Sequence, residues 1–116
     1  MIIMEQWRTV AEFPYYEVSN YGVVRRIAHY KDDGSILRQR VLKQVQTGHV
    51  LRVNFHSKKS RRVDRIVANA FLSNPNGYRF IYHKDGNTTN NRADNLEWCS
   101  YNRDLERRRR YGTAIR

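Results

Sequence analysis

One short segment of the sequence gathers side chains that could carry out acid–base chemistry. Residues 83–91 read HKDGNTTNN, so that a single imidazole, that of His83, is followed closely by turn-forming residues. With an ordinary pKa near about 6.5, an imidazole can take a proton from water at neutral pH. The amides of Asn87, Asn90 and Asn91 can hydrogen-bond loop backbone that no strand or helix satisfies. The segment therefore predicts a loop that holds a working imidazole in place.

The charge of the chain indicates a polyanionic partner. The sequence contains 22 lysines and arginines against 11 aspartates and glutamates, which gives a formal net charge of +11. Such an excess causes self-repulsion unless a polyanion neutralises it, and nucleic acid is the leading candidate. The charge count alone does not separate DNA from RNA, or binding from cleavage.

Length and composition predict one compact domain that works inside a cell. A chain of 116 residues can bury one modest core. It contains no run of roughly 20 apolar residues that could cross a membrane. The first residues, MIIMEQW, do not resemble a secretion signal, so we expect a cytoplasmic protein. Because Cys99 is the only cysteine, an internal disulfide and a zinc site with several thiolates are excluded.

The first half of the chain alternates in the way that antiparallel sheet does. Residues 15–27 read YYEVSNYGVVRRI, two β-favouring runs on either side of residues 19–22, which predicts a hairpin. Residues 49–56 read HVLRVNFH and alternate apolar with polar positions, which predicts a strand with one face in water. The sequence KDDGS at residues 31–35 predicts a loop.

In the second half the apolar period changes to that of a helix. The apolar stripe of this predicted helix consists of Val63, Ile66, Val67, Ala70 and Phe71. Asp64 and Arg65 lie off the stripe, and SNPNG at residues 73–77 ends the helix. After it, the pattern predicts a strand at residues 79–83, a loop, a strand at residues 96–98, and a helix that begins near Ser100.

These segments together resemble a known family of enzymes. Residues 83–98, HKDGNTTNNRADNLEW, resemble the motif of HNH endonucleases. YYEVSNYGVVRR, with Trp7 ahead of it, looks like the NUMOD4-type module that accompanies HNH domains in phage and homing endonucleases, and RIVANAFLSNPNG matches the segment that joins the two. The resemblance implies an α+β fold. An N-terminal antiparallel β-sheet module, residues 1–60, would precede a ββα-metal (HNH, His-Me finger) domain, residues 61–116, with a connecting helix at residues 62–72.

The resemblance also implies metal-dependent cleavage of double-stranded DNA. In the family a histidine base and one divalent ion, Mg²⁺ or Mn²⁺, hydrolyse a phosphodiester. Such a reaction needs an activated water and a cation on the phosphate, held in line, and His83 would be the general base. At the family's spacing Asn95 would position the base and Asp104 would bind the metal, for which a carboxylate is suitable. We expect a monomer, which would nick one strand, whereas a dimer could break both.

Some positions depart from the family's pattern and leave alternatives open. Tyr82 stands where the family has a further metal ligand, and a neutral phenol binds Mg²⁺ poorly. Asn102 is the alternative ligand if the register shifts, and Asp64 is either a spare carboxylate near the site or a residue that starts a helix. Asp104 could instead pair with a basic residue one turn further along its helix. If cleavage has been lost, the chain would be a catalytically impaired HNH-fold DNA-binding protein.

Basic residues near these elements are expected to contact the phosphates of DNA. The six that we select are Arg25, Arg26, Arg65, Lys84, Arg107 and Arg108. About six phosphate contacts would give a slope of about −5 in a plot of the logarithm of the binding constant against the logarithm of salt concentration. A third hypothesis, an RNA-binding protein, would be tested by competition between duplex DNA and RNA at fixed salt.

Overall fold

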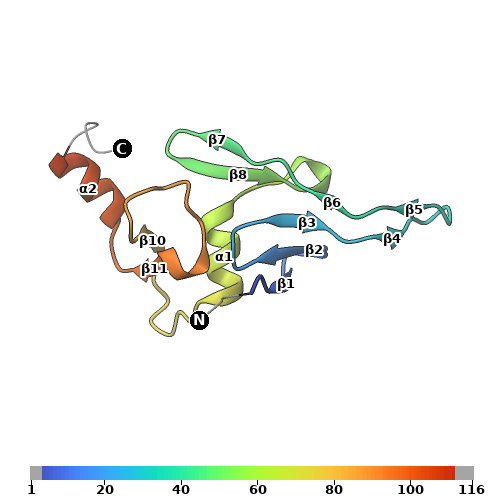
Figure 1. Ribbon diagram of the computed structural model, residues 1–116, viewed down its shortest axis with the longest axis horizontal. Coiled ribbons are helices and arrows are strands. Elements are labelled where there is room, and N and C mark those ends of the chain that lie inside the picture. Colours follow the sequence, from blue (N-terminus) through green and yellow to red (C-terminus); the bar gives the residue numbers. More distant parts are fainter. Residues whose placement is uncertain (1–3, 112–116) are drawn as a thin grey trace.

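The computed structural model describes residues 4–111, with the side chains of Ser57 and Tyr111 left aside (Figure 1). Within this range short antiparallel strands fill most of the first half, and the α-helices follow. The predicted α+β class is therefore confirmed. None of the helices in this range is long and apolar enough to cross a membrane.

The N-terminal strands form a four-stranded antiparallel sheet in the order β1–β2–β3–β6. Its strands are β1 (Trp7–Val10), β2 (Phe13–Ser19), β3 (Val24–Arg26) and β6 (Arg40–Val41). The pairing of β2 with β3 confirms the predicted hairpin. Gly22 lies in the turn between them with φ of +88°, a conformation that glycine adopts without steric strain.

A two-stranded ribbon extends from this sheet. It consists of β4 (His29–Tyr30) and β5 (Ile36–Leu37), which pair antiparallel. The predicted loop at residues 31–35 closes the ribbon, and the backbone N–H of Lys31 donates to the carbonyl of Ser35 at 2.8 Å. The ribbon projects away from the body of the molecule, to the right in Figure 1. The molecule is consequently elongated, with extents of 55 × 31 × 29 Å.

A second antiparallel sheet has the order β7–β8–β9. Its strands are β7 (Val45–Thr47), β8 (Val50–Asn54) and β9 (Ser60–Arg62), and the short 3₁₀ helix η1 (His56–Lys58) turns the chain between β8 and β9. Val53 and Phe55 are buried, whereas Asn54 between them is exposed. The predicted strand with one apolar face is therefore confirmed.

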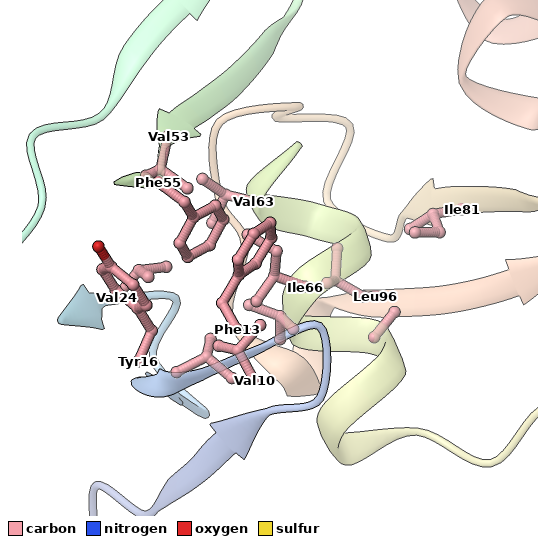
Figure 2. Packing of buried hydrophobic residues seen from close by; sticks show 13 residues of the cluster. Val10, Phe13, Tyr16, Val24, Val53, Phe55, Val63, Ile66, Ile81 and Leu96 are labelled. Atoms are coloured by element: carbon pink, nitrogen blue, oxygen red, sulfur yellow. The ribbon is translucent and has the colours of Figure 1, made fainter. Parts of the chain in front are cut away.

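Helix α1 (Val63–Phe71) lies in the middle of the molecule and organises the core. Val63, Ile66 and Val67 of the predicted stripe are buried against strands from both halves of the chain. Figure 2 shows Phe13 and Phe55 beside this helix, and their rings stack with centroids 4.1 Å apart. The core cluster continues from the N-terminal sheets to Ile81 and Leu96. Packing therefore has no break at residue 60, and the division into residues 1–60 and 61–116 remains a prediction.

The last third has the predicted order of strand, loop, strand and helix. These elements are β10 (Phe80–His83), η2 (Ala93–Asn95), β11 (Leu96–Cys99) and α2 (Arg103–Tyr111), and β10 pairs antiparallel with β11. Helix α2 begins later than expected, at Arg103 instead of near Ser100. The reason is local: the side chain of Asn102 accepts a hydrogen bond from the N–H of Leu105 at 3.0 Å and so caps the helix.

Candidate active site

His83 is the last residue of β10 and the centre of the candidate site. Its position across the hairpin is opposite Leu96 of β11, and 0% of its surface is exposed. The chain turns directly after it, and the N–H of Gly86 donates to the carbonyl of His83 at 2.9 Å. Gly86 adopts φ of +79° in this turn, which glycine tolerates. The imidazole is therefore fixed at the junction of a strand and a tight turn.

Asp104 holds His83 through two hydrogen bonds. The backbone N–H of His83 donates to Asp104 Oδ1 at 3.1 Å, and ring atom Nδ1 lies 2.5 Å from Asp104 Oδ2. Asp104 itself is 8% exposed and lies in the first turn of α2. The carboxylate thus joins helix α2 to strand β10. The contact is direct, so the two side chains leave no space for an ion between Nδ1 and Oδ2.

The other ring nitrogen of His83 faces Asn91, which the sequence predicted to bond loop backbone. Nε2 lies 2.9 Å from Asn91 Oδ1 and 3.8 Å from Asp64 Oδ2. We expected the Asn91 amide to bond loop backbone, but it is buried against the imidazole. Asp64 is also buried, at 1% exposure, although it lies off the apolar stripe of α1. Asp64 lies in the first turn of α1 as well as near His83, so its position agrees with both predicted alternatives.

These contacts affect the protonation of His83. Burial alone would lower its pKa, but the hydrogen bonds to Asp104 and Asn91 and the negative charges of Asp104 and Asp64 raise the pKa above its ordinary value. The imidazolium form can donate to Asp104 from Nδ1 and to Asn91 from Nε2. Among the described residues, the buried Nδ2 of Asn91 has no hydrogen-bond partner. A half-turn of the amide would bring Nδ2 to Nε2 when the imidazole is neutral, so Asn91 can bond either form.

Asn95 fixes the loop that follows His83. Its Nδ2 donates to Asp85 Oδ1 at 3.0 Å and to the carbonyl of Asn90 at 2.8 Å, and its Oδ1 accepts from the N–H of Asp85 at 3.0 Å. Asn87 accepts from the N–H of Thr89 at 3.0 Å, as expected for a loop asparagine. The contacts of Asn95 act on the loop, whereas Asn91 touches the ring of His83 directly. The only signal for Asn91 in the sequence is its place in the asparagine pair at residues 90–91.

The N-terminal sheet contacts the same loop through the turn between β2 and β3. The N–H of Ala93 donates to the carbonyl of Asn20 at 2.8 Å. A Cβ added at Gly22 would lie 3.0 Å from the carbonyl oxygen of Asn91, which shows how closely the hairpin turn approaches the loop. The side chain of Gln44 donates to the carbonyl of Gly22 at 2.7 Å. The first half of the chain therefore packs directly against the loop segment that contains Asn91.

The oxygen atoms predicted to bind a metal all accept hydrogen bonds from the protein. Both carboxylate oxygens of Asp104 accept from His83, as described above. Asp64 accepts from Arg62 Nε at 3.1 Å and from Arg62 Nη2 at 2.6 Å. The hydroxyl of Tyr82 contacts Arg107 Nη2, and Asn102 caps α2. Across residues 4–111 no three side chains among His, Cys, Asp and Glu are placed to hold an ion. The donor set does not fit a divalent cation in this arrangement.

Two cavities with basic walls lie beside α2. The smaller, about 80 Å³, is lined by Arg62, Arg65 and Arg108, and Asp104 and Asn102 also reach it. The larger, about 230 Å³, is lined by Tyr82, Tyr101, Arg103, Glu106, Arg107 and Arg110. Three of the basic residues predicted to contact DNA therefore lie close to the elements that hold His83.

The other three predicted DNA-binding residues do not line these two cavities. Arg25 Nη2 pairs with Glu17 at 2.8 Å, and its guanidinium lies 3.5 Å from the centre of the Trp7 ring. Arg26 donates to the carbonyl of Arg38 at 2.8 Å. Lys84 is exposed next to His83. DNA contact by these residues remains a prediction.

Comparison with known proteins adds to this geometry. Residues 5–82 match the NUMOD4 motif, and this match covers more than half of the 116-residue chain. The chain belongs to the NUMOD4 family. It is also similar to two proteins of Acanthamoeba polyphaga mimivirus that are named as uncharacterised HNH endonucleases, with 33% identity over 99 residues and 31% over 103 residues. The predicted resemblance to HNH endonucleases is therefore confirmed.

The structural comparison gives the same fold for this NUMOD4 protein. The HNH homing endonuclease I-HmuI, in a structure titled for its DNA binding and cleavage, aligns with a TM-score of 0.64 and 28% identity over 93% of this chain. The chain spans 60% of that structure, and only 28% and 24% of the two mimivirus proteins. HNH endonucleases as a class use a divalent metal ion.

Proposed function

We propose that this NUMOD4 protein is an HNH-type endonuclease that hydrolyses phosphodiester bonds in double-stranded DNA. The main support is the environment of His83, whose two ring nitrogens are bonded to Asp104 and Asn91 inside a loop crosslinked by Asn95. The names of its relatives and the net charge of +11 point to the same substrate. As a single site, it would nick one strand and act as a monomer in the cytoplasm, that of a host cell if the gene belongs to a phage.

In the proposed reaction His83 is the general base. Asp104 holds a proton on Nδ1, so the neutral imidazole carries its free electron pair on Nε2. Nε2 takes a proton from a water molecule, the resulting hydroxide attacks phosphorus, and the bond from phosphorus to the leaving sugar oxygen breaks. That oxygen then gains a proton from solvent. Because Asn91 covers Nε2, its amide has to turn or to share the position with the attacking water.

This proposal changes the role of Asp104 from metal ligand to orienting partner of His83. The family resemblance implies a Mg²⁺ or Mn²⁺ ion, but the oxygens of Asp104, Asp64 and Tyr82 are already engaged by protein donors. We therefore assign no step of the reaction to an ion. Asn95 is proposed to position the base through the loop, and Arg65 and Arg108 to bind phosphate.

Nicking of supercoiled plasmid tests the proposed function. Wild-type protein, tested in parallel with Mg²⁺, Mn²⁺ or EDTA, should convert supercoiled DNA to open circles. His83→Ala should lower the rate by about 100-fold or more, because a positioned base contributes about 10² to 10⁴ in rate. His29→Ala is a matched control, since this histidine lies in β4 of the projecting ribbon, outside the loop and outside both cavities beside α2. Equal rates for wild type and His83→Ala would refute the role of His83.

A second candidate function is DNA binding without cleavage. The complete burial of His83 favours it, because a general base must reach water. In this case wild type and His83→Ala would both shift the plasmid in a gel, and neither would nick it under any ion condition.

A further inference from the structure

The residue before His83 holds two arginines. Tyr82 occupies the position at which the HNH motif has a metal ligand, and the residue is 9% exposed. The guanidinium of Arg103 lies 4.0 Å from the ring centre, and that of Arg107 lies 4.9 Å from it. Arg107 Nη2 also donates to the hydroxyl of Tyr82. Cations are attracted to an aromatic face, so the ring and hydroxyl together fix Arg107.

Arg107 also lies against the turn that follows His83. A Cβ at Gly86 would overlap Arg107 Nη1, so the guanidinium lies directly against the backbone of this turn. Arg107 is half-buried. Within the part of the chain that the structure describes, no carboxylate forms an ion pair with it. A guanidinium has five N–H donors, and the Tyr82 hydroxyl accepts only one hydrogen bond from it here. The remaining donors are available to an anion.

The surrounding cavity carries net positive charge. Its wall contains Arg103, Arg107 and Arg110 against a single acid, Glu106, whose Oε1 lies 3.4 Å from Arg110 Nη2. Such a wall repels a divalent cation and attracts a phosphate, which a guanidinium can bind through two parallel hydrogen bonds. The acid that the motif would use for an ion, Asp104, faces His83 instead.

We propose that Arg107, held by Tyr82, binds the phosphate of DNA at the point where HNH enzymes use a metal ion. Its guanidinium supplies the positive charge that the ion supplies elsewhere, so the site engages DNA without a divalent cation. The inference rests on the proposed function for the identity of the ligand, a nucleic-acid phosphate. It goes beyond that function because the positive charge at the phosphate comes from an arginine of the chain and not from a bound ion.

The first test measures metal binding and DNA binding separately from cleavage. Mn²⁺ is titrated into wild-type protein with a short duplex, and the free ion is followed by electron paramagnetic resonance. We expect no Mn²⁺ bound beyond that bound by the duplex alone, and an affinity for labelled duplex in EDTA at least equal to that in Mg²⁺. One additional Mn²⁺ per complex, or binding that requires the ion, would overturn the proposal.

The second test removes the positive charge of Arg107. Arg107→Gln should weaken duplex binding in EDTA at least about threefold more than Arg109→Gln, which removes the same charge from an exposed position of the same helix. It should also reduce the magnitude of the salt slope by about 1. Tyr82→Phe keeps the ring and removes the hydroxyl, and its affinity should lie between wild type and Arg107→Gln. Equal affinities for the Arg107 and Arg109 variants would refute the phosphate contact.

The variant Tyr82→Asp distinguishes a phosphate site at Arg107 from a metal site at position 82, because the two predict opposite results. A carboxylate at this position would pair with Arg103 and Arg107, so we expect weaker DNA binding and no Mn²⁺ site. If the position were a missing metal ligand, Mn²⁺ binding and nicking would both increase.

Cleavage gives a further test. If wild type nicks plasmid, nicking should persist in EDTA and should fall at least about tenfold in Arg107→Gln. Absence of nicking in every condition would refute the proposed function, and the binding measurements would still decide the role of Arg107.

Discussion

At the scale of single residues, His83 combines complete burial with a raised pKa. A histidine loses its charge on burial unless acceptors face it, and here Asp104 and Asn91 contact the two ring nitrogens. Asp64 contributes further negative charge at 3.8 Å. The charged form is thus favoured inside the protein, although a general base must be neutral. Activity and stability should consequently depend on pH in opposite directions.

The nicking rate should rise with pH through the raised pKa of His83. A base acts only when unprotonated, so half of the maximal rate should be reached above about pH 6.5, the ordinary value for histidine. Asp104→Asn removes a negative charge that raises this pKa, so it should move the midpoint to lower pH and reduce the maximal rate at least about tenfold. Initial rates between pH 5 and 9 test this, and an unchanged midpoint in the variant would contradict it.

The contribution of His83 to stability should have the opposite dependence. Because its pKa is raised in the folded state, this contribution is fully present below the ordinary pKa of histidine and is lost as pH rises through the folded-state pKa. Urea unfolding at a series of pH values should show a decline in the free energy of unfolding across this interval. In His83→Gln the decline should be smaller, and an identical pH profile would argue against the assignment.

At the scale of elements, the hairpin turn between β2 and β3 packs against the loop that follows His83. Gly22→Ala should destabilise the protein by about 1 to 3 kcal/mol, because φ is +88° and the new Cβ would press on the Asn91 carbonyl. Gly48→Ala is the matched control, since φ is +62° there and nothing lies within 4 Å of the added atom. Urea unfolding measures both variants. A nicking rate reduced only by Gly22→Ala would confirm the link to Asn91.

The N-terminal cap of α2 sets the position of Asp104. Asn102→Ala should cost about 1 kcal/mol of stability, whereas Asn102→Ser should retain most of it, because serine also caps helices. The nicking rate of the serine variant should stay close to that of wild type. A large loss of nicking in Asn102→Ser with stability preserved would return Asn102 to the role of a ligand.

Helices, strands and turns that depend on patterns of neighbouring residues could be predicted from the sequence. The β2–β3 hairpin, the helix at residues 63–71 and the strand–loop–strand–helix order all follow from turn residues and apolar periodicity, which are properties of neighbouring positions. The burial of Asp64 was not predictable in this way, since it depends on His83 and Arg62 meeting it in space. The contact of Asn91 with the imidazole likewise depends on how the loop folds back. The start of α2 was misplaced because the capping role of Asn102 was not recognised.

At the scale of the whole molecule, an elongated body carries a large positive charge. The extents of 55 × 31 × 29 Å and the net charge of +11 suit a long polyanion better than a small ligand. If about six phosphates are contacted, the logarithmic salt slope of binding should be about −5 between roughly 50 and 200 mM salt. Fluorescence anisotropy with labelled duplex measures this slope. A value near zero would show that charge contributes little to DNA binding.

Helix α1 is covered by strands that precede residue 60 and by strands that follow it. A fragment cut between the two groups would present Val63, Val67 and Leu96 to water and would aggregate. A recombination event that joined only one half to a foreign gene would therefore leave this apolar surface uncovered. The packing around this single helix therefore favours inheritance of the two halves together, as one segment.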